Sequence, residues 1–257
     1  MKNKIEWKQM GQVLATVVKL FTNITAVFKK IAVGPEILEW LVEDGKEFFE
    51  SKLTELGQEF LKTINAKNPD RVKMIGWWEA FYKKHFGINV SLSGIQIPDR
   101  PAVGKWRLLI LVPGLTNNCV YDVLQKHFTC WRYTEDLDAG VPVNERDPSK
   151  IGAYAIWVRD VIEADDCHKN KSANMVAAER PVLKTETLLE RMIHELVYFL
   201  ETDGHLDTSN WTLCSGSRGA GGDVPCACWY GGKFQIDWFY AGYWNDGLRP
   251  REVISLV

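Results

Sequence analysis

One polar segment concentrates the side chains that could do chemistry: RDVIEADDCH, residues 159–168. It follows GAYAIWVRD, an apolar run typical of a buried strand. Carboxylates at a strand end can hold Mg²⁺ or Ca²⁺ through oxygen ligands, and a lysine such as Lys169 or Lys171 would complete a site of nuclease type. A charged run is more often a solvated loop, and no calcium-loop spacing is present. The candidate catalytic residues are Asp160, Glu163, Asp165 and His168.

A second segment of interest is CSGSRGAGGDVPCACWYGGKFQIDWF, residues 214–239. A phosphate cradle would need its glycines to lead into a helix N-terminus, whereas here they lead into Asp223 and an apolar strand pattern. The pattern therefore favours a strand connection over a nucleotide site. Arg218 is the anion-binding candidate of this loop, for a free anion or a carboxylate of a neighbouring chain.

The end of the same segment predicts a β-hairpin. Two alternating runs, VPCACWY and KFQIDWFY, flank Gly231 and Gly232, the two-residue signal of a tight turn. In this register the apolar pairs share one side, and Cys226 and Cys228 fall on the opposite side with Gln235. The apolar pairs are Trp229 with Phe234, Ala227 with Ile236, and Pro225 with Trp238.

Metal and nucleophile signatures are weak elsewhere. Cys214, Cys226 and Cys228, with a remote His205, make a poor zinc set, so half-buried free thiols are expected. In HELVY a zincin would need a histidine where Tyr198 stands, so His194 and Glu195 are expected on a helix surface. The sequence has no G-x-S-x-G elbow, although a triad assembled in space stays open.

The N-terminal third predicts an amphipathic helix with a broad apolar stripe. Residues 1–34 hold six lysines and one glutamate, whereas residues 35–64 hold eight acidic residues and three lysines. The acidic segment is the expected partner of the basic helix, within the chain or in another copy, ahead of a membrane surface or nucleic acid. The candidate interface residues are Val13, Val17, Leu20, Phe21, Ile24 and Phe28.

The expected fold class is α+β, with a helical domain over residues 1–97 and an α/β domain over residues 98–257. The second domain should contain a mixed sheet and a C-terminal β-hairpin. Residues 87–97 suggest an edge strand, and the order strand, short helix, strand over residues 106–133 predicts a right-handed βαβ unit. The strongest helix of this half covers residues 183–206.

Several of these stretches resemble one family, described only as uncharacterised proteins of uncultured, small-genome bacteria. The resemblance is carried by AVFKKIAVGPEILEWL, GAYAIWVRD and TLLERMIHELVYFLETDGHLD, followed by TLCSGSR and GDVPCACWY. It spans most of the chain. It implies no activity, cofactor or catalytic residue.

The functional expectation is a non-enzymatic, self-assembling or interaction protein whose partner is itself or another protein. No cofactor and no bound metal belong to that expectation, and a net charge of −2 gives no argument for nucleic acid. Two alternatives remain: a metal-dependent hydrolase or nuclease using residues 160–168, and a binding module using exposed tryptophans on sugars or bases. Scattered cysteines and the lack of a secretory pattern predict a cytoplasmic protein.

Overall fold

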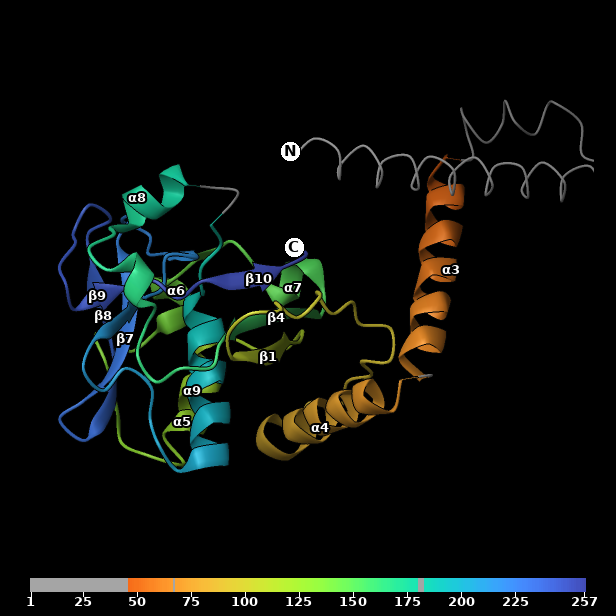
Figure 1. The fold of residues 1–257 in the computed structure, drawn as a ribbon, viewed down its shortest axis with the longest axis horizontal. Helices are drawn as coiled ribbons and strands as arrows, with labels where there is room; N and C mark the ends of the chain where they lie inside the picture. Colours follow the sequence, from red (N-terminus) through yellow and green to blue (C-terminus); the bar gives the residue numbers. More distant parts are fainter. Residues whose placement is uncertain (1–45, 67, 180–182) are drawn as a thin grey trace, which may run out of the picture. The chain divides into compact units, whose positions relative to one another are not determined.

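The computed structural model describes residues 46–66, 68–179 and 183–257, which are coloured in Figure 1. The chain divides into two units, residues 1–58 and 59–257. The apolar stripe from Val13 to Phe28 lies outside the described residues, so the interface expected there stays a prediction. The domain boundary expected after residue 97 stays a prediction as well.

Within the described residues, two helices precede the sheets: α3 (Lys46–Ala66) and α4 (Pro69–Phe86). The side chain of Asn68 accepts hydrogen bonds from two backbone N–H groups of the first turn of α4, and Gly87 ends the helix with φ 69°. Helix α4 lies within the helical region expected over residues 1–97. It buries Trp78 and Tyr82 on one face, and the Tyr82 hydroxyl donates to the carbonyl of Ile110.

The strands of the described residues form three separate sheets. The first is antiparallel, in the order β1-β4-β10. The second is mixed, in the order β2-β8-β7-β5-β9, and the third is the β3–β6 pair. The strands are β1 (Trp106–Leu111), β2 (Cys130–Arg132), β3 (Val143–Asn144), β4 (Tyr154–Arg159), β5 (Trp211–Leu213), β6 (Ser217–Arg218), β7 (Val224–Tyr230), β8 (Lys233–Phe239), β9 (Leu248–Arg249) and β10 (Val253–Ser255).

The predicted βαβ unit is wrong, because β1 and β2 belong to different sheets. The helix between them, α5 (Asn117–Leu124), instead carries the chain from one sheet to the other and packs on α9. The expected edge strand is also absent: residues 88–97 are irregular, although Leu92 and Ile95 are buried. The carboxylate of Glu79 accepts the backbone N–H of Leu92, which replaces a strand hydrogen bond.

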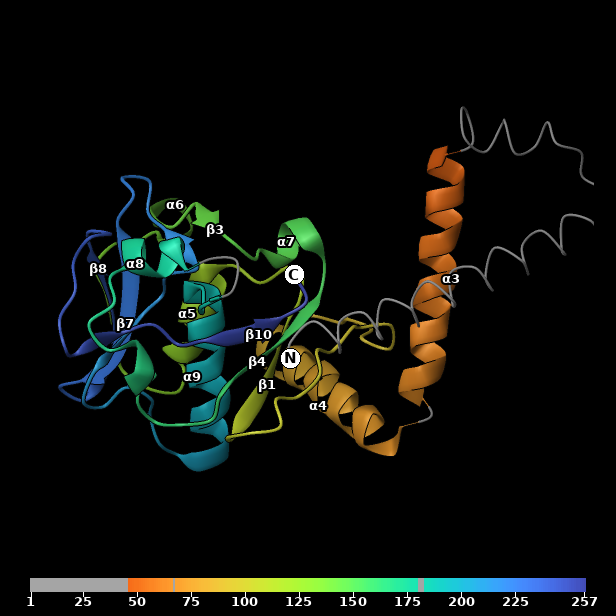
Figure 2. The ribbon, with the colours of Figure 1, turned by 45° about the horizontal axis from the view of Figure 1, so that its top comes forward.

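Helix α9 (Leu188–Thr202) lies between the two larger sheets, as Figures 1 and 2 both show. It begins with a capping box formed by Thr187 and Glu190. All ten residues from Leu188 to Val197 are buried, because sheets cover this helix from both sides. The shorter helices are α6 (Leu137–Gly140), α7 (Pro148–Ile151), the 3₁₀ turn η1 (Asp166–His168) and α8 (Ala173–Ala178).

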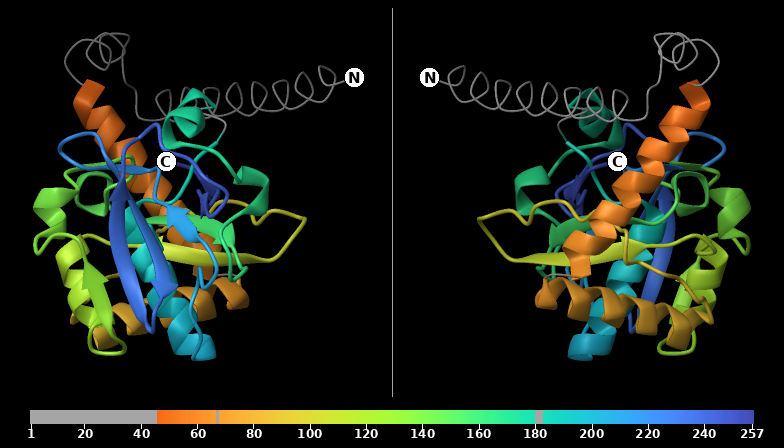
Figure 3. Two further views of the ribbon diagram at one scale, coloured as in Figure 1. Left: turned by 90° about the vertical axis from the view of Figure 1, so that its left-hand side faces the viewer. Right: turned by 90° about the vertical axis from the view of Figure 1, so that its right-hand side faces the viewer.

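The β7–β8 hairpin, in front in the left view of Figure 3, has the predicted register. Trp229 pairs with Phe234, and both turn glycines have positive φ, as a tight turn requires. The opposite face differs from expectation. Cys226 and Cys228 are fully buried rather than half-buried, because Leu213, Val224 and Leu248 form a second small core around Cys226.

The α+β fold class, with a mixed five-stranded sheet and a C-terminal hairpin, is confirmed. The β7–β8 hairpin and α9 share one apolar core with β1 and β4. This shared core holds the five-stranded sheet and the three-stranded sheet together. Within the described ranges, no helix has the length and apolar character needed to cross a membrane.

Candidate functional site

The end of β4 and the start of β10 bring a carboxylate and a guanidinium side by side. Val158 pairs with Val253 in the antiparallel register, so the next pair outward is Arg159 with Glu252. Nη2 of Arg159 lies 3.7 Å from Oε2 of Glu252. Glu252 is 87 positions from Asp165, and only the sheet brings it to the predicted 160–168 segment.

A single 3₁₀ turn adds two further side chains. The backbone N–H of His168 donates to the carbonyl of Asp165, at 2.9 Å, and closes the turn. Asp165 is the N-cap residue of this turn, and a carboxylate oxygen of Asp165 lies within 4.8 Å of an imidazole nitrogen of His168. The backbone N–H of Glu252 donates to Oδ2 of Asp165 at 2.7 Å and fixes this turn against β10.

Asp165, His168 and Glu252 therefore converge. One potential ligand atom from each lies within 4.8 Å of the others, the one such group of three among the described residues. The side chain of Asp165 is 1% exposed, that of His168 10% and that of Glu252 27%, so the group opens to solvent at Glu252.

Four buried atoms, three of this group and one of the neighbouring Arg159, carry unused hydrogen-bonding capacity. Oδ1 of Asp165, both ring nitrogens of His168 and Nε of Arg159 are buried without a hydrogen-bond partner among the described residues. Buried polar atoms are nearly always paired, so a concentration of four in one place indicates a missing partner. An electron-pair acceptor would satisfy the carboxylate and one imidazole nitrogen together.

The positive charge of Arg159 lies beside the carboxylates of Asp165 and Glu252 and offsets part of their negative charge. Burial raises the pKa of Asp165, against the lowering effects of the Glu252 N–H and of two arginines, Arg251 and Arg159. The pKa of Glu252 is lowered, first by His168 and then by Arg159. Nε of Arg159 lies 3.5 Å from Oδ1 of Asp165, too long for a hydrogen bond, and its guanidinium also stacks over Trp106.

The other two predicted catalytic residues lie apart from this group. Asp160 accepts hydrogen bonds of 2.9 and 3.1 Å from Arg107. Glu163 accepts the Thr208 hydroxyl and the backbone N–H groups of Ser209 and Asn210, which ties two loops together. Both carboxylates are thus engaged in structural contacts.

The lysines near the segment pair with carboxylates outside the group. Lys169 lies 3.9 Å from Asp246, and Lys171 lies 2.8 Å from Glu179. The anion candidate Arg218 donates from Nη1 to the carbonyls of Ser215 and Ser217, so half of its guanidinium fastens its own loop.

A buried charged network surrounds α9, contrary to the expected helix surface. His194 and Glu195 are fully buried. Arg191 donates to Glu195 at 2.8 Å and to Asp207 at 3.0 Å, and Arg251 donates to the other Asp207 oxygen at 2.6 Å. The sequence pattern failed here because a helix buried on all sides need not be apolar when each charge meets an opposite one.

A second part of the network caps the start of α9. Glu190 accepts two hydrogen bonds from Arg146, at 2.7 and 2.8 Å, and one from the Tyr154 hydroxyl. The Glu190 carboxylate also accepts the Thr187 backbone N–H. Because Glu190 is fully paired, its role is structural.

Glu186 and His194 form a buried pair with spare capacity. Oε1 of Glu186 and Nδ1 of His194 lie 2.8 Å apart, while Oε2 and Nε2 have no partner in the described chain. Burial raises the pKa of Glu186 to about 8, and burial lowers that of His194 well below its usual value. Both side chains are fully enclosed, so the pair has no access to a substrate.

Burial also raises the pKa of the Cys214 and Cys226 thiols, which leaves them as neutral core side chains. His205 stacks flat on Trp229, with ring centroids 3.3 Å apart, and its Nδ1 lies 2.8 Å from Oε1 of Glu195. The structure thus gives the cysteines a packing role.

Glu252 is the member of the group that sequence reasoning missed. No local spacing connects it to Asp165, and its only signal is a single acidic residue before the last apolar run, REVISLV. The comparisons with known proteins add no precedent: no family model, curated protein or solved structure matches the chain.

Proposed function

We propose that this protein binds a divalent transition-metal ion through Asp165, His168 and Glu252 and acts as a metal-dependent hydrolase. One observation carries the proposal. Three ligand-type side chains from distant positions converge within 4.8 Å, and the buried Asp165 oxygen and both His168 nitrogens have no hydrogen-bond partner in the described residues. A metal ion would satisfy the Asp165 oxygen and one of the two His168 nitrogens together.

The donor set favours a particular class of metal. One imidazole nitrogen and two carboxylates suit Zn²⁺, Mn²⁺ or Fe²⁺, whereas Mg²⁺ and Ca²⁺ prefer oxygen donors alone. Three protein ligands also leave coordination positions for water, as in hydrolytic sites. The metal would supply a water of lowered pKa, and the exposed side at Glu252 would admit the substrate.

Arg159 fits this proposal as a replaceable counter-charge. It lies 3.5 Å from Asp165 and 3.7 Å from Glu252 without a short hydrogen bond to either, and its side chain is 35% exposed. A metal ion would displace the guanidinium a short way toward solvent. The guanidinium would then lie next to the metal, where it could stabilise negative charge that develops on a substrate oxygen.

Calorimetric titration of the full chain with Zn²⁺ and Mn²⁺ tests the site. We expect one ion per chain for the wild type and at least a tenfold loss of affinity for His168→Ala and Glu252→Gln. The matched control is Asp166→Asn, because Asp166 occupies the same turn, is 86% exposed and contacts Arg249 instead. Binding that is absent, or unchanged in both ligand variants, would overturn the metal site.

Hydrolysis is tested separately with p-nitrophenyl acetate and bis-p-nitrophenyl phosphate. Turnover should depend on added metal and disappear in His168→Ala. Metal binding without any turnover would keep the site and remove the hydrolase. A cytoplasmic location belongs to the same proposal and is supported by the six free cysteines.

A further inference from the structure

A groove of about 500 Å³ lies at the end of β8, away from the three proposed ligands. Its walls come from the segment after β2, from α6, from the glycine-rich loop before β7 and from β8 itself. Aromatic and acidic side chains predominate. The residues used below are Tyr133, Gly140, Gly219, Asp223, Asp237, Trp238 and Tyr240.

Trp238 is built into this groove by two glycines. A Cβ on Gly140 would lie 3.3 Å from Cη2 of the indole, and one on Gly219 would lie 3.8 Å from Cζ3. A side chain at position 140 would therefore crowd the six-membered ring, whereas the Gly219 distance is an ordinary van der Waals contact. Tyr133 meets the indole edge-on, with ring centroids 6.3 Å apart and planes at 84°. The rings thus form a defined corner rather than a loose surface.

The glycine-rich loop places a carboxylate beside this corner. The Gly219 N–H donates to the carbonyl of Asp223 at 2.7 Å, and the Gly222 N–H donates to the carbonyl of Gly219 at 3.0 Å. These two bonds close the loop and hold Asp223 at the groove. Asp237 also lines the groove, and its Oδ1 accepts the N–H of Trp238.

The charge of the groove indicates the sign of its ligand. Two carboxylates line it, and among the described residues that line it there is no lysine or arginine. The faces of Tyr133, Trp238 and Tyr240 are electron-rich and attract cations further. A phosphate-bearing ligand would be repelled, and a neutral sugar would stack on the rings but gain little from two negative charges.

We propose that this groove binds a small organic ammonium ion, with the aromatic rings around the cationic head and the two aspartates as counter-charges. The same arrangement of rings recognises quaternary ammonium groups in general. This assignment replaces the sugars or bases expected for exposed tryptophans, and it is independent of the metal site.

Ligand-observed NMR titration of the full chain with choline tests the proposal, with 3,3-dimethylbutan-1-ol as its uncharged isostere. We expect saturable binding of choline, weakened by added NaCl, and much weaker binding of the alcohol. Tyr133→Ala should weaken choline binding by about 3- to 30-fold, the span of a cation–π contact. Asp223→Asn should also weaken it, because a counter-charge is lost.

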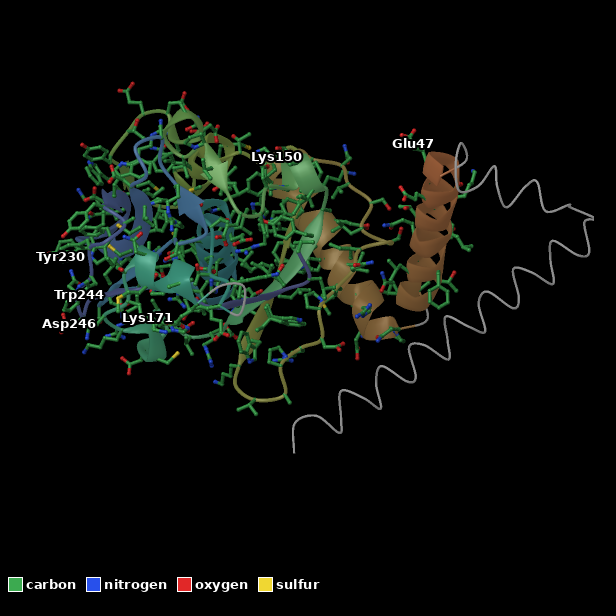
Figure 4. All side chains as sticks on the ribbon, turned by 90° about the horizontal axis from the view of Figure 1, so that it is seen from above. Glu47, Lys150, Lys171, Tyr230, Trp244 and Asp246 are labelled. Carbon is green, nitrogen blue, oxygen red and sulfur yellow. The ribbon has the colours of Figure 1, made fainter. Side chains whose placement is uncertain are left out.

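Two matched variants control for nonspecific effects. Tyr230, labelled in Figure 4 at the hairpin tip, is as exposed as Tyr133, at 67%, and does not line the groove. Asp246, also labelled there, is an exposed aspartate outside the groove. Tyr230→Ala and Asp246→Asn should bind choline as the wild type does. Equal binding of choline and the alcohol, binding of N-acetylglucosamine in place of choline, or equal loss in the control variants would overturn the proposal.

Discussion

The backbone N–H of Glu252 donates a 2.7 Å hydrogen bond to the carboxylate of Asp165. This contact joins the turn after β4 to the start of β10, and it leaves the other Asp165 oxygen, Oδ1, directed away from the bond with no partner in the described residues. One carboxylate thus has a structural oxygen and an available oxygen. The two roles can be separated by mutation.

The structural role predicts different stabilities for Asp165→Ala and Asp165→Asn. Alanine leaves the buried Glu252 N–H unpaired, which should lower the free energy of unfolding by about 1–3 kcal/mol. Asparagine keeps an acceptor oxygen and should cost less than about 1 kcal/mol, while it weakens metal binding. Urea unfolding measures both, with Asp166→Ala as the surface control. Equal destabilisation by the two Asp165 variants would contradict this reading of the bond.

The counter-charge role of Arg159 predicts tighter metal binding when that charge is removed. Arg159→Gln should increase the affinity for Zn²⁺ roughly tenfold, or ~1.4 kcal/mol, because the ion no longer displaces a guanidinium from the two carboxylates. Arg249→Gln is the matched control, since Arg249 pairs with Asp166 at 3.0 Å on the other side of the turn. If both variants shift the affinity equally, the effect is one of net charge alone.

The raised pKa of Glu186 predicts a pH-dependent stability. Its ordinary value is 4.5 and burial raises it to about 8, so the native state holds the proton more tightly than the unfolded state. The free energy of unfolding should therefore fall as the pH rises from about 4.5 to about 8, by up to ~1.4 kcal/mol per pH unit, and then level off. Arg251 and Arg191 oppose this shift, while Glu190 and Asp207 increase it.

Glu186→Gln isolates that dependence. Glutamine keeps a hydrogen bond to His194 and carries no titrating proton, so the variant should gain stability relative to the wild type as the pH rises from 5 to 8. Chemical unfolding at four pH values in this window measures the difference. Glu179→Gln serves as the control, because the side chain of Glu179 is exposed. A difference that does not change with pH would show that Glu186 ionises normally in the folded protein.

The assembly expected from the N-terminal stripe has its own test. Light scattering of the full chain should give a mass well above 29.4 kDa. Leu20→Asp and Ile24→Asp together should reduce it to that of the monomer, because two charges would have to be buried in an apolar interface. Lys19→Asp is a control with a comparable charge change on a polar position. A monomeric wild type would remove the assembly hypothesis.

The local features of this chain were predictable because they depend on neighbours in sequence. The α4 boundaries follow from Asn68, Pro69 and Gly87, which supply a cap, a compatible first residue and a left-handed stop. The hairpin register follows from Gly231 and Gly232. Among candidate site residues, Asp165 and His168 were predicted because they belong to one polar, acidic segment directly after an apolar strand pattern.

Tertiary structure decided the rest. Whether β1 and β2 share a sheet depends on strand partners far along the chain, and no pattern in either strand specifies them. His194 and Glu195 look like surface residues until Arg191, Asp207 and Arg251 are brought around α9 from separate elements. The α+β class and the tight hairpin turn could be predicted, since both follow from local sequence patterns. Only long-range packing placed Glu252 beside Asp165, because a contact between residues 87 positions apart leaves no signal in local composition.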